Sequence, residues 1–252
     1  MSLRHHEIAE TDHRILNPLL AGDLVTLAEA ADLQPGMSVL DLCSGKGEML
    51  CQWARSCGVT GVGVDFSQVF VAAARSRALE LGVSDAVSFL EAEAAEQSRV
   101  LARERPSSFD VVACLGATWI GGGLAGTVEL MRPLARPGGT LLVGEPFYEE
   151  PPPEAAFSAW GFEADSYTSL AGTLDRLEGM GLDLVEMVAA DARGWERYEA
   201  SRWKALARWL EAHPEDPERE ALARFLANDR RAYMAWGRRY LGWAVFVTRP
   251  KG

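Results

Sequence analysis

VLDLCSGKGE, residues 39–48, joins a short apolar run to a turn that contains two glycines. The apolar residues of GEMLCQWARSC (47–57), which follows at once, recur at the spacing of a helix. A strand that passes through such a turn into a helix presents backbone N–H groups, unobstructed by side chains, at the helix N-terminus. These residues therefore predict a strand–turn–helix unit that binds a cofactor.

Apolar runs and helical patterns alternate on either side of this unit. Helical patterns occupy residues 67–81, 124–135 and 166–181. Parallel neighbours in a sheet need a crossover connection, which a helix supplies, so the alternation predicts an α/β fold with a mostly parallel sheet. The runs expected to form strands are SVLDL (38–42), GVGVD (61–65), AVSFLEAE (86–93), FDVVACLG (109–116), GTLLVGEPF (139–147), LDLVEMVAA (182–190) and GWAVFVT (242–248).

Aromatic and apolar residues recur at helical spacing between Trp195 and Tyr240, with an interruption at residues 213–217. This pattern predicts two helices inserted before the last strand, within residues 191–240. An aromatic helical stripe usually belongs to the core, but part of this one could roof a ligand cavity. No linker divides the chain, so residues 1–252 are expected to form one domain.

Charge and cysteine usage restrict the class of partner. The formal net charge is -11 over 252 residues, which opposes binding to nucleic acid or to an anionic membrane. The longest uncharged run, 111–128, holds five glycines and makes a poor membrane span. The four cysteines form no C-x-x-C pair, so neither a disulfide framework nor a metal site is expected. The composition therefore favours a cytoplasmic protein with a small-molecule partner.

Each of the first three predicted strands has an acidic residue in it, at its end or directly after it. Asp41 lies in the first strand, Asp65 ends the second, and Glu93 follows the third. Carboxylates only accept hydrogen bonds, and the hydroxyls of a ribose and the amine of an adenine donate them. Leu50 stands where a G-x-G-x-x-G fingerprint would place its third glycine, which argues against a dinucleotide.

In combination, D-x-[GC]-x-G-x-G (41–47), the two later acids and the PGG that leads into the fifth strand resemble class I S-adenosylmethionine-dependent methyltransferases. Four further segments resemble a bacterial group of small-molecule methyltransferases whose acceptors are mostly unassigned: HRI with NP (13–18), GATWIGGG (116–123), GEP (144–146) and GWERYEASRW (194–203). The resemblance implies a Rossmann-like, seven-stranded, mostly parallel sheet with helices on both faces. It also implies transfer of a methyl group from S-adenosylmethionine to a small-molecule acceptor by in-line displacement.

The resemblance also implies a role for each position that matches the family's motifs. Cys43 stands where the family usually has its first glycine. The positions around the methionine part of the cofactor are Asp41, Cys43, Ser44, Gly45 and Gly47. Those around the ribose, the adenine and the methyl exit are Asp65, Phe66, Glu93, Ala94, Cys114, Gly116 and Trp119.

A general base helps if the acceptor is a hydroxyl. His13 is one candidate, because the resemblance places residues 1–22 over the site; Glu145 and Tyr148 are others, at the end of the fifth strand. His5 and His6 are expected to be disordered. Two alternatives stay open, a protein that binds S-adenosylmethionine without turnover and an NAD-dependent oxidoreductase.

Overall fold

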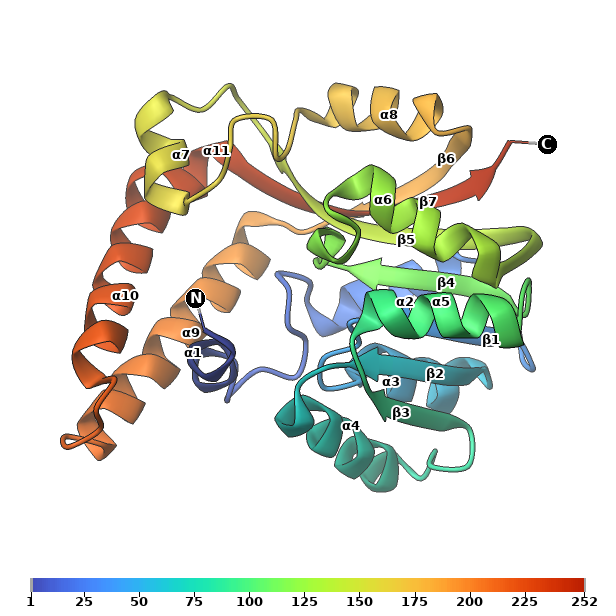
Figure 1. The fold of residues 1–252 in the computed structure, drawn as a ribbon, viewed down its shortest axis with the longest axis horizontal. Coiled ribbons are helices and arrows are strands. Elements are labelled where there is room, and N and C mark those ends of the chain that lie inside the picture. The colour runs from blue at the N-terminus through green and yellow to red at the C-terminus, as the bar shows by residue number, and fades with distance from the viewer. Residues whose placement is uncertain (1, 252) are drawn as a thin grey trace.

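The computed structural model describes residues 2–251, in which one seven-stranded sheet separates two layers of helices (Figure 1). The strands lie in the order β3-β2-β1-β4-β5-β7-β6. All neighbours pair in parallel except β7, which is antiparallel to both β5 and β6. The strands are β1 (Ser38–Leu42), β2 (Thr60–Asp65), β3 (Val87–Glu91), β4 (Phe109–Leu115), β5 (Ala135–Tyr148), β6 (Leu182–Ala189) and β7 (Leu241–Pro250).

The strand order reverses between β1 and β4, which are parallel neighbours with Leu42 beside Cys114. The chain moves outward from β1 to β2 and β3, and then returns to the other side of β1. Connections therefore leave the carboxyl ends of β1 and β4 in opposite directions and open a crevice between them. Ligands of α/β sheets bind at such a point.

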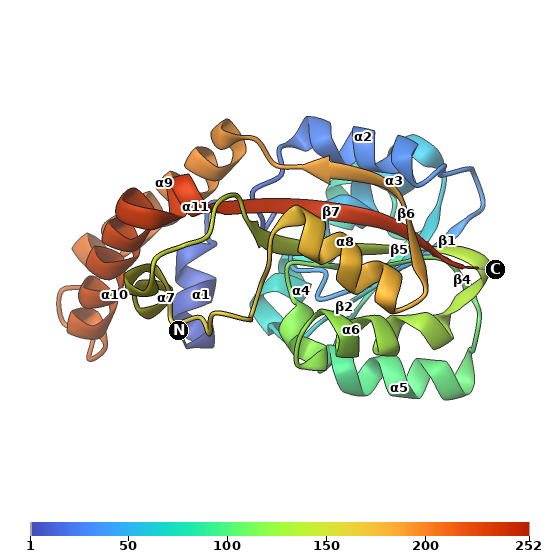
Figure 2. The ribbon, with the colours of Figure 1, turned by 90° about the horizontal axis from the view of Figure 1, so that it is seen from above.

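Two apolar cores hold the helices against the sheet. Helices α2, α3 and α4 pack on one face, around Leu27, Trp53 and Ala74, and α5, α6 and α8 pack on the other, around Leu101, Val128 and Leu177 (Figure 2). The helices are α1 (Leu3–Ala9), α2 (Ala21–Ala30), α3 (Glu48–Cys57), α4 (Gln68–Leu81), α5 (Ala94–Glu104), α6 (Leu124–Met131), α7 (Glu154–Trp160), α8 (Leu170–Gly179), α9 (Ala192–Ala212), α10 (Arg219–Ala232) and α11 (Arg238–Tyr240), with short turns η1 (Thr118–Gly121), η2 (Arg132–Leu134) and η3 (Tyr233–Gly237).

A helical arm formed by α9 and α10 extends from the sheet, with α7 beside α10 and α1 beside α9 (Figure 1). A third apolar cluster joins Ile8 of α1 to Leu206 and Leu210 of α9 and to Leu222 and Leu226 of α10. This cluster fixes the N-terminal helix on the arm, at the side of the molecule where the carboxyl ends of β1 and β4 lie.

The α/β fold, its seven strands and the helical insertion before the last strand are confirmed. The expectation that His5 and His6 are disordered is wrong, because both lie in α1. Helix α1 has only 7 residues, too few to show a helical periodicity in the sequence, and apolar contacts with distant elements hold it in place. Helices α2, α5 and α7 were not predicted either.

Candidate active site

The turn after β1 adopts a backbone that L side chains rarely take. Cys43, Gly45 and Gly47 all have positive φ angles, of 62°, 53° and 67°. A Cβ atom at Gly47 would lie 2.5 Å from the ring of Phe89, so only glycine fits there. Cys43 adopts the left-handed conformation in spite of its side chain, which is strain of the kind that functional turns hold.

Asp65, at the end of β2, holds this turn in place. Its Oδ2 atom accepts a hydrogen bond of 2.8 Å from the Gly45 N–H, and its Oδ1 atom accepts one of 2.9 Å from the Ser67 N–H. Burial raises the pKa of Asp65, and the two N–H donors oppose that rise. Burial, and then the nearby charge of Asp65, raise the pKa of Asp41 well above its usual value.

A cavity of about 210 Å³ lies over this turn, at the carboxyl ends of β1, β2 and β4. We call it the first cavity. Ser44 lines it, and the buried hydroxyl of Ser44 has no hydrogen-bond partner among residues 2–251. The other residues that line it include His6, Arg14, Ile15, Leu16, Asn17, Asp41, Cys43, Gly45, Asp65, Phe66, Phe70, Gly116, Trp119 and Tyr198.

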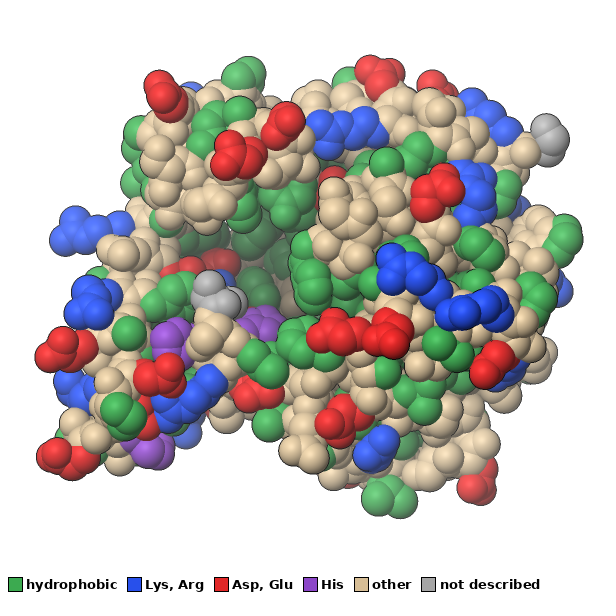
Figure 3. Space-filling model, viewed as in Figure 1, with side chains coloured by type: hydrophobic (Ala, Val, Ile, Leu, Met, Phe, Trp, Pro, Cys, Tyr) green, Lys and Arg blue, Asp and Glu red, His purple; other side chains and the backbone are tan. Residues whose placement is uncertain are grey.

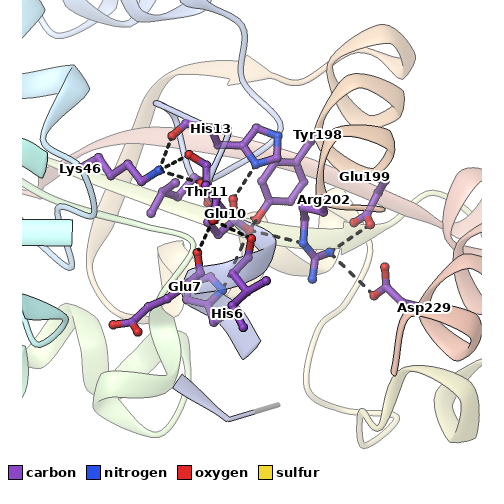
Figure 4. Close-up of polar contacts among 12 residues, drawn as sticks. His6, Glu7, Glu10, Thr11, His13, Lys46, Tyr198, Glu199, Arg202 and Asp229 are labelled. Atoms are coloured by element: carbon purple, nitrogen blue, oxygen red, sulfur yellow. Dashed lines mark hydrogen bonds and ion pairs between the residues drawn. The ribbon is translucent and has the colours of Figure 1, made fainter. Parts of the chain in front are cut away.

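Lys46 attaches the N-terminal segment to the turn. Its ammonium group donates three hydrogen bonds, of 2.7, 3.0 and 2.8 Å, to the carbonyls of Glu10, Thr11 and His13 (Figure 4). Ser67 adds a hydrogen bond of 2.6 Å to a carboxylate oxygen of Glu7. Residues 6 and 14–17 thereby form one wall of the first cavity.

A second cavity, of about 540 Å³, opens between the helical arm and the sheet. Figure 3 shows the hollow on this side of the molecule, with hydrophobic side chains inside it. Aromatic side chains line much of the second cavity: Trp160, Phe162, Trp195, Tyr198, Phe225, Tyr233 and Trp243. Four residues line both cavities and form the wall between them: Leu16, Asn17, Gly116 and Tyr198.

The fully buried carboxylate of Glu10 lies at the centre of a polar network behind this wall (Figure 4). It accepts hydrogen bonds from Tyr198, at 2.9 Å, and from Nδ1 of His13, at 2.7 Å, and lies 3.3 Å from Arg202. Burial opposes ionisation of Glu10, but the His13 hydrogen bond and the Arg202 charge outweigh it and lower its pKa. Glu10 is therefore an anion held by three side chains.

The structure brings most of the expected cofactor residues together, but not all of them. Eight of the twelve predicted positions line the first cavity: Asp41, Cys43, Ser44, Gly45, Asp65, Phe66, Gly116 and Trp119. Gly47 lies below it as the residue before α3. Glu93 is exposed at the start of α5, Ala94 is buried beside it, and Cys114 points into the core on the face of α5 and α6.

The three expected bases lie in different places. His13 is hydrogen-bonded to Glu10 and lines a shallow recess beside Tyr198. Glu145 and Tyr148 line neither cavity. Glu145 is 2% exposed, and burial raises its pKa to about 7 against the opposing effects of Thr118 and Arg176. Tyr148 packs edge-on against Phe157.

Sequence reasoning missed His6, Leu16 and Asn17 as residues that line the first cavity. The HRI and NP segments at residues 13–18 were the available signal, because they resemble a family motif outside any predicted helix or strand. His6 carried no such signal. Its ring meets the ring of Phe70 edge-on, at 5.4 Å between centroids, and burial lowers its pKa.

The comparisons with known proteins agree with this geometry. A model of the methyltransferase domain family matches residues 33–200. The uncharacterized protein YjhP of Escherichia coli is 43% identical over 242 residues, which cover 95% of each chain. Two crystal structures of S-adenosylmethionine-dependent methyltransferases in complex with S-adenosyl-L-homocysteine are also similar. One, from Geobacter sulfurreducens, has a TM-score of 0.93 at 43% identity and covers 99% of both chains; the other, from Thiobacillus denitrificans, has a TM-score of 0.91 at 41% identity over the same shares.

The chain therefore belongs to the methyltransferase domain family, and it is an S-adenosylmethionine-dependent methyltransferase with a Rossmann-like class I fold. This result favours a methyltransferase over the NAD-dependent oxidoreductase that the sequence left open. Within residues 2–251, no helix is long and apolar enough to cross a membrane. The same residues contain no group of three or more metal-binding side chains.

Proposed function

We propose that this methyltransferase acts on a small-molecule acceptor that binds in the second cavity, while the cofactor binds in the first. The observation that carries the proposal is the wall that the two cavities share, built from Leu16, Asn17, Gly116 and Tyr198. An in-line displacement needs the acceptor atom and the methyl group to meet at one point. The shared wall is where two ligands in adjoining cavities come closest.

The residues of the first cavity fit S-adenosylmethionine. Asp41 and Asp65 line the cavity with carboxyl groups, whose ionised form a positively charged sulfonium would favour, and the hydroxyl of Ser44, which has no partner among the described residues, is available to a polar group of the ligand. The left-handed turn at residues 43–47 brings backbone N–H groups to the cavity. Phe66 and Trp119, whose rings lie 6.1 Å apart, offer apolar faces to the adenine. Glu93 and Ala94 are proposed to meet the adenine edge, and Cys114 to support the turn at the methyl exit from behind.

The bound cofactor supplies an electrophilic methyl group and a neutral leaving group. The protein's own contribution is to align the acceptor and exclude water. Lys46 and Ser67 hold the N-terminal segment over the first cavity, which shields it from solvent. Gly116, with a φ of 84°, brings bare backbone to the shared wall and leaves room for a transferred group.

His13 is the best placed of the three expected bases. Glu10 holds its Nδ1 atom, so Nε2 is left without a partner in a buried position. A carboxylate on one ring nitrogen orients the imidazole and fixes its tautomer. His13 lines neither cavity, but its ring centroid lies 5.0 Å from that of Tyr198, which lines both, and we propose that it receives a proton released by the acceptor at the Tyr198 side of the wall. We assign no step to Glu145 or Tyr148.

The test measures S-adenosylhomocysteine release with panels of small-molecule, protein and nucleic-acid acceptors, and cofactor binding by calorimetry. Asp65→Ala should weaken cofactor binding by roughly 1 to 3 kcal/mol, because charged hydrogen bonds are lost. Ala159→Trp should fill the second cavity and abolish turnover with unchanged cofactor binding, whereas Ala155→Trp, on the same helix but outside the cavity, should do neither. Release with proteins or nucleic acids alone would contradict the proposal.

A further inference from the structure

We infer that the acceptor carries a cationic nitrogen, an ammonium or alkylammonium group, which binds at the end of the second cavity that Glu199 and Asp229 line. The inference rests on the proposed function, since it takes the second cavity as the acceptor site. It adds the chemical class of the acceptor.

The charges at this end of the cavity do not balance. Arg202 is the one basic side chain among the described residues that line the second cavity. Its guanidinium lies 3.0 Å from Glu199, 3.8 Å from Asp229 and 3.3 Å from Glu10 (Figure 4). Three carboxyl groups thus share one guanidinium. Glu10 also bonds to His13 and Tyr198, whereas Arg202 is the one cation within ion-pair distance of Glu199 and Asp229 among the described residues.

Burial makes this imbalance significant. Glu10, Glu199 and Arg202 are 0%, 7% and 8% exposed. Buried carboxylates are stable only when they are paired or protonated, so the excess carboxyl needs either a proton or a second cation. Burial raises the pKa of Glu199, which favours the proton when the cavity holds no ligand, and a ligand that brings a positive charge replaces that proton. An anionic ligand would instead meet two carboxyl groups, and Nη1 of the guanidinium is already bonded to Glu199.

The walls of the cavity match a cation as well. Trp195 and Tyr233 line the second cavity with ring centroids 6.5 Å apart, and Trp203, which does not line it, lies 5.6 Å from Tyr233. Aromatic faces attract ammonium groups, and the attraction is stronger where water is excluded. Trp203 also donates a hydrogen bond of 2.8 Å to Asp229, which fixes that carboxylate beside the rings.

Tyr233 is independent evidence that this end of the cavity receives a ligand. It lines the second cavity, is 8% exposed, and its buried hydroxyl has no partner within the described residues. Trp195 lines the same cavity with an unpartnered indole N–H. Buried polar groups are rarely left without partners. Both groups can donate a hydrogen bond to an oxygen atom of the ligand. A ligand that carries a cationic nitrogen and a nearby hydroxyl or carboxylate would therefore pair with the two carboxyl groups and with both of these donors.

Two probes of equal shape separate charge from packing. Choline carries a quaternary nitrogen where 3,3-dimethylbutan-1-ol carries a neutral carbon. Binding of each to the full-length protein is measured by calorimetry or ligand-observed NMR, with S-adenosylhomocysteine present. We expect choline to bind at least tenfold more tightly than the neutral alcohol. Equal affinity, or binding of neither probe, would overturn the inference.

Substitutions of the residues that line the second cavity then test where choline binds. Glu199→Gln and Asp229→Asn should each weaken choline binding at least fivefold, and Glu220→Gln, an exposed change on the same helix as Asp229, should leave it unchanged. Tyr233→Phe keeps the ring, so it should spare choline more than Tyr233→Leu does. An unchanged affinity in both carboxyl variants would contradict the assignment. Binding of S-adenosylhomocysteine to the first cavity is recorded for every variant, so a failure here is distinguishable from a failure of the proposed function.

Discussion

The phenolic oxygen of Tyr198, on α9, lies 2.9 Å from the Oε1 atom of Glu10, the residue that follows α1. The hydrogen bond joins α9, in the helical arm, to the end of the N-terminal helix α1. Tyr198 also lines both cavities, so the bond fixes the wall between cofactor and acceptor from behind. Burial and the charge of Glu10 raise the pKa of Tyr198 well above its usual value, so the phenol stays protonated and donates.

Tyr198→Phe keeps the ring and removes only this donor. We expect turnover to fall about tenfold while binding of S-adenosylhomocysteine changes little, because the wall is loosened but the first cavity keeps its carboxylates. The free energy of unfolding should fall by roughly 1 to 3 kcal/mol, since a buried carboxylate loses a partner. Kinetics, calorimetry and urea unfolding check this, and a lost cofactor affinity at unchanged turnover would contradict it.

Lys46→Met removes the ammonium that binds three carbonyls of the N-terminal segment. We expect residues 3–17 to exchange their amide hydrogens faster and cofactor affinity to fall, because this segment forms part of the first cavity. Hydrogen exchange followed by mass spectrometry measures the first effect. Lys204→Met, at an exposed position on α9, is the control and should change neither quantity.

Cys43 stands in a left-handed conformation that favours glycine, with a φ of 62°. Cys43→Gly should therefore be more stable than Cys43→Ala, by about 1 kcal/mol, because both changes remove the thiol and only alanine keeps the strained Cβ. Urea unfolding of the two variants gives the difference. If alanine proved the more stable of the two, the strain assigned to this turn would be absent.

The raised pKa of the buried Glu145 carboxyl predicts that the stability of the protein depends on pH. Its pKa is about 7 in the folded protein, above the ordinary value of 4.5, so the folded state binds more protons between these values. Stability from this group is fully present below pH 4.5 and is lost as the pH rises through about 7. Glu145→Gln stays neutral, so relative to wild type it should gain up to about 3 kcal/mol between pH 5 and pH 8.

The control for this prediction is Glu154→Gln, at an exposed position at the start of α7. Urea unfolding at the two pH values measures both variants against wild type. A relative stability of Glu145→Gln that is the same at pH 5 and pH 8 would show that the buried carboxyl ionises normally.

The sequence by itself determined the sheet and the turn of the first cavity. Strand β1, the glycines at 45 and 47 and the acid at 65 form one contiguous supersecondary unit, so their spacing along the chain carries the information. The apolar runs located the central strands for the same reason, since a strand buried on both faces is apolar throughout, whereas the edge strand β6 is mostly exposed. Those residues sufficed to predict the fold class and a cofactor-binding turn, and their resemblance to class I methyltransferases implied the cofactor and most of the residues that line the first cavity.

Only the tertiary structure decided the second cavity and the network around Glu10. Glu10 and Tyr198 are 188 positions apart, and Asp229 reaches Arg202 from a different helix. Single side chains on short or separately amphipathic helices leave no periodic pattern that points to their partners. Their contacts follow from how the arm packs against α1 and the sheet, and that packing is a sum of nonlocal apolar contacts which no local spacing encodes.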